Sequence, residues 1–246
     1  MDRLLEATAR AERDHFWFRG FRRFVAPMLA QAVRDRPGAT MLDCGCGTGH
    51  NLNLLRRYGR AVGIDLTWTG LASAHLRGER AVAQASATLL PFADARFDVV
   101  TSFDVIYALD DADEAAALAE MFRVLRPGGH LLVNVAAMDL LKGNHSVLAG
   151  EVRRYSRTSL GDRLRRHGFE IRRLTYTNAA ILPLVAAVRL LQRVSGHEES
   201  QEEITIRAAP INAALTALLA IEAAALRLVN MPFGSSLLAL ARKRPQ

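Results

Sequence analysis

The sequence predicts an α/β fold in which a mostly parallel sheet carries helices on both faces. The main observation is that short apolar runs alternate with helical stretches between Ala39 and about Ala137, a pattern typical of βαβ units. In addition, the 246 residues are 50% hydrophobic and 23% charged, which is enough for a large core and too apolar for a disordered chain. We therefore expect one elaborated domain.

The first 38 residues have a helical, amphipathic pattern with aromatic side chains clustered at 15–19, and Pro37 and Gly38 end it as a turn. The next region contains the predicted strands and the helices between them, such as 112–125. The predicted strands are the apolar runs 39–43, 60–65, 97–102 and 130–135, with a shorter strand around 81–85.

Beyond Met138 the pattern changes, because two further predicted strands enclose two long aliphatic helical stretches and a polar, acidic joining segment. The strands are 169–175 and 235–241, and the helical stretches are 179–194 and 208–229.

Charge and hydropathy exclude several classes of partner. The formal net charge of +7 would suggest nucleic acid, but only Lys142 and Lys243 are lysines, and an Arg-rich, Ala-rich composition indicates a coding bias. We expect no nucleic-acid partner. We also expect no transmembrane segment, because the first aliphatic stretch contains Pro183 and Arg189 and the second carries Glu222; peripheral contact with a membrane stays open.

Cysteine usage and the first residues predict a reducing, cytoplasmic compartment. Cys44 and Cys46 are too few and too close together for a disulfide framework. No further Cys or His pair stands at the spacing of a zinc site, so no metal is expected. Charges within residues 1–6 interrupt the apolar run that a signal peptide needs.

A glycine-rich loop at 45–49 is the most informative segment. The predicted strand 39–43 ends in Asp43, and glycines follow at alternate positions before the next helix. Glycines let backbone N–H groups approach a ligand closely. The G-x-G-x-G spacing differs from the G-x-G-x-x-G of a diphosphate site, and a carboxylate at Asp43 repels a diphosphate but suits an ammonium group. This favours S-adenosylmethionine over a nicotinamide dinucleotide; the alternative is a tight turn with a capping Asp.

Asp65 supports the cofactor interpretation. It ends the second predicted strand about twenty residues after the loop, where an acidic side chain accepts hydrogen bonds from ribose hydroxyls. Cys44 and Cys46 fill the variable positions of the loop, where small buried side chains are the plainer interpretation.

These motifs resemble those of the class I S-adenosylmethionine-dependent methyltransferases, in the small-molecule "type 11" group. The resemblance depends on the order and spacing of the loop 43–49, Asp65, the run 90–92 with 97–100 after it, and the segment 125–129. Looser similarity to a subgroup extends to 15–23, 153–155 and 233–238.

The resemblance implies a doubly wound, Rossmann-like sheet of seven strands, with the two last strands forming an antiparallel hairpin at one edge. It also implies the following division: an N-terminal helical lid (1–38), a cofactor-binding core (39–178), a helical insertion that covers substrate or contacts a second copy (179–231), and the last strand with a tail (232–246).

The resemblance also assigns cofactor contacts. The glycines would pass close to the methionine part and the ribose, Asp43 would reach the amino group, and Asp65 would hold the ribose. The family usually has an Asp after the third strand, where this chain has Ser86 and Ala87; Ser86 accepts a hydrogen bond more weakly, so the backbone of Ala87 would hold the adenine. The expected cofactor-binding residues are Trp17, Arg22, Asp43, Gly45, Cys46, Gly47, Gly49, Asp65, Leu66, Ser86, Ala87 and Phe103.

In this fold the N-terminal helix commonly closes over the cofactor. Helical spacing places Phe18, Phe21, Arg22 and Val25 near one face. Arg22 could then pair with the cofactor carboxylate, while Trp17 walls the pocket. The alternative is an amphipathic helix packed on the sheet edge.

Candidate catalytic residues lie after the fourth and fifth strands, where ligands bind in such sheets. They are Tyr107, His145 and Glu151. Asp104 could also face the substrate, although a helix cap is an equal alternative; Tyr107 could be a core residue, and His145 and Glu151 could lie in a solvated loop. Arg153 and Arg154 are expected to form surface ion pairs.

The predicted function is transfer of a methyl group from S-adenosylmethionine to a small, rather apolar molecule, with O-methylation slightly favoured. The aliphatic stretches must bury a face against the sheet domain, a second copy of the chain, or an apolar ligand. Two alternatives are a non-methylating reaction such as cyclisation and a lipid-linked or membrane-associated acceptor.

Overall fold

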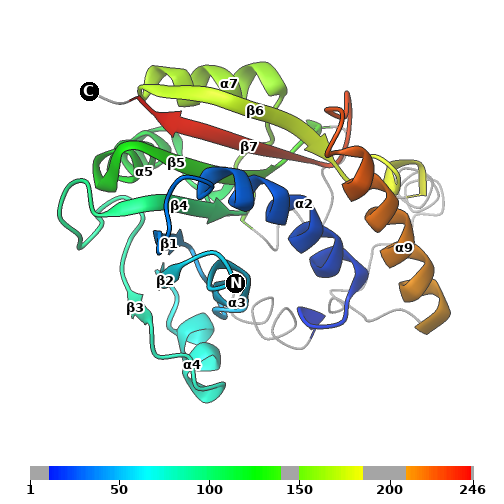
Figure 1. Cartoon of the computed structure of the whole chain (residues 1–246), viewed down its shortest axis with the longest axis horizontal. Coiled ribbons are helices and arrows are strands. Elements are labelled where there is room, and N and C mark those ends of the chain that lie inside the picture. The colour runs from blue at the N-terminus through cyan, green and yellow to red at the C-terminus, as the bar shows by residue number, and fades with distance from the viewer. Residues whose placement is uncertain (1–10, 140–149, 185–208, 245–246) are drawn as a thin grey trace.

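The computed structural model describes residues 11–139, 150–184 and 209–244, and within them a single sheet runs through the molecule (Figure 1). Its strands are β1 (Thr40–Cys44), β2 (Arg60–Asp65), β3 (Val82–Gln84), β4 (Phe97–Phe103), β5 (Leu125–Ala136), β6 (Phe169–Thr177) and β7 (Ser236–Lys243). The helices are α2 (Phe16–Ala32), α3 (Leu52–Leu55), α4 (Trp68–Leu76), η1 (Ile106–Ala108), α5 (Asp111–Val124), α7 (Arg157–Arg166) and α9 (Ala209–Ala225).

The seven strands lie in the order β3-β2-β1-β4-β5-β7-β6. The first five pair in parallel, whereas β7 is antiparallel to both β5 and β6. The predicted α/β fold with an antiparallel hairpin at one edge is therefore confirmed. The order reverses between β1 and β4, and ligands of open α/β sheets bind at such a switch point, beyond the carboxyl ends of the strands.

The strand β5 is longer than the sequence predicts. The Arg-Pro-Gly-Gly segment 126–129 looks like a turn, but β5 begins at Leu125, which pairs with Phe97. A register shift follows on β4 between Phe97 and Val99, and Gly128 has a φ of 74°. An irregularity of this kind lets a strand pass through glycine residues without ending.

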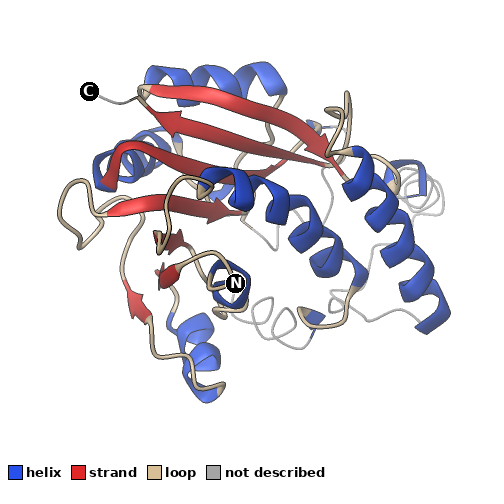
Figure 2. Cartoon of the chain, viewed as in Figure 1, coloured by secondary structure: helices blue, strands red, loops and turns tan. Residues whose placement is uncertain are grey.

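Alternate residues along each strand point to opposite faces of the sheet, as the period of two requires. Met41 and Val99 pack with α2, α3 and α9, whereas Leu42 and Val100 pack with α5 and α7. Figure 2 shows helices on both sides of the strands. Both faces of the central strands are thus buried, which explains their continuous apolar runs.

The helix α9 lies beside α2, although the two are far apart in the sequence (Figure 1). Gly20 of α2 touches Leu219 of α9 so closely that a Cβ at position 20 would lie 2.4 Å from Leu219 Cδ1. Asn212 accepts a hydrogen bond from Phe16 N at 2.8 Å and donates one to Asp14 O at 2.8 Å. The N-terminal helix and the helix before β7 therefore form one layer.

Glu222 has a structural role in this layer. It is buried and accepts hydrogen bonds from Ala179 N at 3.0 Å and Ala180 N at 2.9 Å. Of the first aliphatic stretch only 179–184 lies within the described ranges. In the ranges that the structure describes, no helix is long and apolar enough to cross a membrane.

Candidate active site

The glycine loop lies at the carboxyl end of β1, next to the point where the strand order reverses. Gly45, Gly47 and Gly49 have φ angles of 83°, 50° and 75°, a backbone region that favours glycine. Gly45 N and Cys46 N both donate to Ile64 O on β2 at 2.8 Å. These bonds hold the loop against β2 and fix the backbone at the switch point.

Asp43 lies buried beneath this loop. Its Oδ1 accepts a hydrogen bond from Thr101 Oγ1 at 2.6 Å, while its Oδ2 has no partner among the residues that the structure describes. Burial, with a smaller contribution from the nearby carboxylate of Asp65, raises the pKa of Asp43 to about 7, although the hydrogen bond from Thr101 opposes this effect. A buried oxygen without a partner is costly, and a cationic donor that binds at the loop would satisfy it.

Asp65 connects the loop to the end of β2. Its Oδ2 accepts from Gly47 N at 2.7 Å, and its Oδ1 accepts from Thr67 N at 2.8 Å and Thr67 Oγ1 at 2.5 Å. A carboxylate oxygen has about two acceptor positions, so Oδ2 keeps capacity for one further donor such as a ribose hydroxyl. Asp65 therefore ties together the two turns that follow β1 and β2 without capping α4, and it keeps room for a ligand.

The neighbouring region exposes apolar side chains. Leu66 is 67% exposed and follows Asp65 directly, and Leu89 is also exposed. Ser86 bonds within its own turn, because its Oγ accepts from Thr88 N at 3.1 Å and lies 2.7 Å from Thr88 Oγ1. The Ser86 hydroxyl is thus partly occupied, and the expected adenine contact of the Ala87 backbone stays a prediction.

The two loop cysteines point into the protein. Cys44 is fully buried, and Cys46 packs so closely on Gly63 of β2 that a Cβ there would lie 2.7 Å from Cys46 Sγ. Burial raises the pKa of both thiols. The thiol of Cys46 therefore faces the core, and any contact with a ligand would involve its backbone.

The helix α2 contacts the site through aromatic rings. Phe21 meets Phe103 at the end of β4 edge-on, with ring centroids 4.9 Å apart, and Trp17 packs on the same apolar cluster. Arg22 donates to Glu12 O at 2.8 Å and Arg13 O at 3.2 Å. Its guanidinium therefore holds the turn before α2 in this structure, and the expected pairing with a cofactor carboxylate stays a prediction.

Glu12 is a site residue that the sequence reasoning missed. It is buried, and its Oε2 accepts a hydrogen bond from Thr48 Oγ1 within the glycine loop. Burial raises the pKa of Glu12, and this hydrogen bond opposes the effect. An acidic residue in an amphipathic stretch looks like part of a solvated face, so no local signal marks this contact.

On the other side of the switch point, Asp104 and Tyr107 follow β4. Asp104 N donates to Asn134 O at 3.0 Å, and Asn134 Nδ2 donates to Asp104 Oδ1 at 2.8 Å. Asp104 does not cap a helix, because η1 has Val105 at its N-cap position without a side-chain cap, and Asp110 caps α5 by accepting from Asp113 N at 2.8 Å. Burial raises the pKa of Tyr107 strongly, and the nearby Asp104 and Glu151 carboxylates add to this.

Glu151 is held in a bidentate pair. Arg154 Nε and Nη2 lie 2.9 Å and 3.1 Å from its two carboxylate oxygens, and both side chains are largely buried. Arg153 pairs through one of its terminal nitrogens with the buried Glu114. The expected ion pairs exist, but the surface location was wrong, since both arginine side chains are largely buried. His145 lies outside the described residues.

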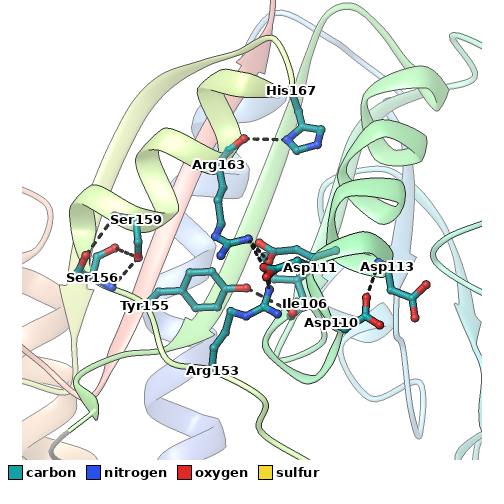
Figure 3. A network of polar contacts seen from close by, with 11 residues as sticks. Ile106, Asp110, Asp111, Asp113, Arg153, Tyr155, Ser156, Ser159, Arg163 and His167 are labelled. Carbon is teal, nitrogen blue, oxygen red and sulfur yellow. Dashed lines mark hydrogen bonds and ion pairs between the residues drawn. The ribbon is translucent and has the colours of Figure 1, made fainter.

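A polar network fixes the segment 151–155 (Figure 3). Val152 N and Arg153 N donate to Tyr107 O at 3.0 Å and 3.2 Å, and Tyr155 OH donates to Ile106 O at 3.3 Å. Figure 3 shows Arg153 from this segment and Arg163 from α7 converging beside Asp111 of α5. The segment 151–155, which carries Glu151, is therefore attached to η1, α5 and α7.

These features define an α/β protein with a candidate ligand site at the carboxyl ends of β1 and β2. Residues 42–133 match the family described as "Methyltransferase domain". The malonyl-acyl-carrier-protein O-methyltransferase of Herminiimonas arsenicoxydans is 35% identical over 61% of this chain and 56% of its own length. The demethylmenaquinone methyltransferase of Mycobacterium marinum is 39% identical over 49% of this chain and 48% of its own length.

A crystal structure of a cyclase has the same fold, with a TM-score of 0.57 and 22% identity, and covers 90% of this chain and 80% of that one. The chain belongs to the class I S-adenosylmethionine-dependent methyltransferases. The match spans about half the length of most of the curated relatives.

Proposed function

We propose that the protein transfers the methyl group of S-adenosylmethionine to a small, rather apolar acceptor. The observation that carries this proposal is the unpartnered, buried Oδ2 of Asp43 beneath the glycine loop. The amino group of the cofactor supplies a cationic donor for it, whereas a diphosphate supplies none. The anion of Asp43 and the close backbone approach at Gly45 and Gly47 therefore fit this cofactor.

The residues at the ends of β1 and β2 would each hold a different part of the cofactor. Asp43 would accept from the amino group, and the remaining acceptor position on Asp65 Oδ2 would take a ribose hydroxyl. Exposed Leu66 would pack on the adenine, next to the backbone of Ala87. Phe103, with Phe21 and Trp17 of α2 behind it, would border the methionine part.

When bound, the cofactor supplies a methyl group on a sulfonium, which is a good leaving group. The chain then needs to orient the acceptor, exclude water and, for a hydroxyl acceptor, receive a proton. His145, Glu151 and Tyr107 are proposed as catalytic residues because they belong to the segments after β4 and β5. We favour O-methylation, which the O-methyltransferase relative supports.

The apolar character of the acceptor is proposed from α9. The solvent side of this helix is lined by Ile211, Leu218 and Ile221, the last of which is 69% exposed. Such a face either covers an apolar molecule or contacts a second copy of the chain. Light scattering at several protein concentrations separates these alternatives, because only the second gives a dimer.

Isothermal calorimetry with the full chain tests the proposed cofactor. We expect binding of S-adenosylmethionine and of its demethylated product, S-adenosylhomocysteine, and no heat with NAD. A positive result with NAD alone would contradict the proposal. Transfer of a labelled methyl group to a panel of phenols, enols, amines and quinones then distinguishes methylation from cyclisation, which leaves the label on the cofactor.

A further inference from the structure

Asp104 has an unusual backbone conformation at the carboxyl end of β4. Its φ is 60°, in the left-handed region that residues other than glycine rarely adopt. Such a conformation costs about 1–3 kcal/mol and persists only where neighbours fix it. Here Asn134 fixes it on two sides, since its carbonyl accepts from Asp104 N and its amide donates to Asp104 Oδ1.

Asp104 is accessible at the carboxyl end of the central strand β4. The residue is exposed, in contrast to Phe103 before it. No hydrogen bond from a described residue reaches its Oδ2. Asp104 therefore offers one fixed oxygen to Asn134 and one oxygen to a molecule that enters from outside.

Asp104 lies between the residues proposed to bind the cofactor and the segment 151–155, which carries Glu151. The next residue, Val105, packs against the glycine loop, since a Cβ on Gly45 would lie 2.1 Å from Val105 Cγ2. On the other side, Val152 N and Arg153 N of the segment 151–155 donate to Tyr107 O, three residues after Asp104. Asp104 therefore precedes a turn that contacts both the glycine loop and the segment that carries Glu151.

We infer that Asp104 is the general base of the methyl transfer and that the acceptor is a phenol or a conjugated enol. This inference rests on the proposed function. The acceptor oxygen gives its proton to Oδ2 of Asp104 and takes the methyl group. One O–H bond and one C–S bond break, one O–C bond and one carboxyl O–H bond form, and the C–S electron pair stays on sulfur.

The surroundings of Asp104 suit this task. Partial removal of water from the carboxyl group and the nearby Glu151 carboxylate together raise the pKa of Asp104 to about 7, against the opposing effect of the hydrogen bond from Asn134. A base with a pKa near the working pH is the most effective. The titratable groups that face it are Tyr107 and Glu151, and Glu151 is less suited as a base because Arg154 binds both of its oxygens.

The acceptor class follows from the strength of this base. A carboxylate of near-neutral pKa takes a proton from a phenol, whose pKa is about 10, far more readily than from an alkyl alcohol. The transfer also neutralises a carboxylate and a sulfonium, so no charge is left on the methylated acceptor. An acceptor that is apolar apart from one acidic hydroxyl fits both conditions.

The variant Asp104→Asn tests the inference in the full chain. Asn keeps the shape and the acceptor for Asn134, and it tolerates the left-handed region as Asp does, so the fold is expected to persist. Asp113→Asn, at an exposed position on α5, is the matched control. For both variants we would measure calorimetric affinity for S-adenosylhomocysteine, carboxyl ¹³C NMR titration, and transfer to phenol acceptors.

We expect Asp104→Asn to leave the affinity for S-adenosylhomocysteine within about two-fold, and to remove one carboxyl signal that titrates near neutral pH. Turnover of phenols should fall about 10²-fold or more, with little change in KM, and the neutral-pH limb of the kcat/KM profile should disappear.

A titration of that signal at about 4, the ordinary value of an aspartate, would overturn the inference. So would a ten-fold loss of cofactor affinity, which would assign Asp104 to the cofactor. Methyl transfer only to amines or carbon acids by the wild type would also overturn it while leaving the proposed function intact. Absence of cofactor binding by the wild type would instead reject the proposed function.

Discussion

Asp65 Oδ2 accepts a hydrogen bond from Gly47 N at a distance of 2.7 Å. The residue expected to hold the ribose therefore also holds the backbone of the glycine loop. The acidic end of β2 and the loop after β1 act as one unit, and a change at Asp65 alters both the ligand contact and the loop.

The variant Asp65→Asn should weaken binding of S-adenosylhomocysteine by about ten-fold or more, which corresponds to about 1.4 kcal/mol. An amide has one acceptor oxygen, so it cannot accept from Gly47, Thr67 and a ribose hydroxyl together. Calorimetry measures the affinity. Asp35→Asn, at an exposed position after α2, is the control and should bind normally; equal affinities for both variants would exclude Asp65 from the cofactor site.

Much of the fold and the centre of the site are readable from the sequence, because their determinants are contiguous. Alternating apolar runs locate the strands, and Asp43 with three nearby glycines marks the loop. The contacts of Glu12 with Thr48 and of Glu151 with Arg154 are not readable in this way. They depend on the packing of separate segments and on whether a charge becomes buried, which periodicity does not report.

Asp43 should reduce the stability of the cofactor-free protein at neutral and higher pH. Its pKa rises to about 7 on folding, so the folded state binds the proton more tightly than the unfolded chain. The stabilisation that comes from this tighter proton binding is fully present below the unfolded pKa of about 4. It is lost as the pH rises through the folded pKa of about 7. Asp43→Asn should therefore raise the free energy of unfolding by roughly 1–3 kcal/mol at about pH 8.

Urea denaturation of the wild type and Asp43→Asn at about pH 5 and pH 8 measures this difference. The variant should gain more stability at the higher pH than at the lower one, where only part of the contribution has been lost, and it should lose affinity for S-adenosylmethionine at both. A variant that is less stable than the wild type at the higher pH would show that the carboxylate is compensated in the free protein.

The buried carboxylate of Glu114 should stabilise the segment 151–155, which carries Glu151. Arg153 and Arg163 both reach its Oε2. Glu114→Gln leaves two partly buried arginines without their anion, so it should reduce the free energy of unfolding by about 2–4 kcal/mol. Asp111 contacts the same two arginines but is 79% exposed, so Asp111→Asn should cost at most about 1 kcal/mol. Similar losses for both variants in urea denaturation would contradict the ranking.

The close approach of Gly20 to Leu219 predicts that α2 and α9 stabilise each other. In Gly20→Ala the new methyl group would meet Leu219 Cδ1 at 2.4 Å and Leu219 Cβ at 3.0 Å. Because both the tip and the base of the leucine are in the way, a change of rotamer does not relieve the clash, and we expect a loss of about 1–3 kcal/mol. The double variant with Leu219→Ala should recover part of this loss. A double-mutant cycle measures the coupling, and simple additivity of the two losses would mean that the helices do not touch at this point in solution.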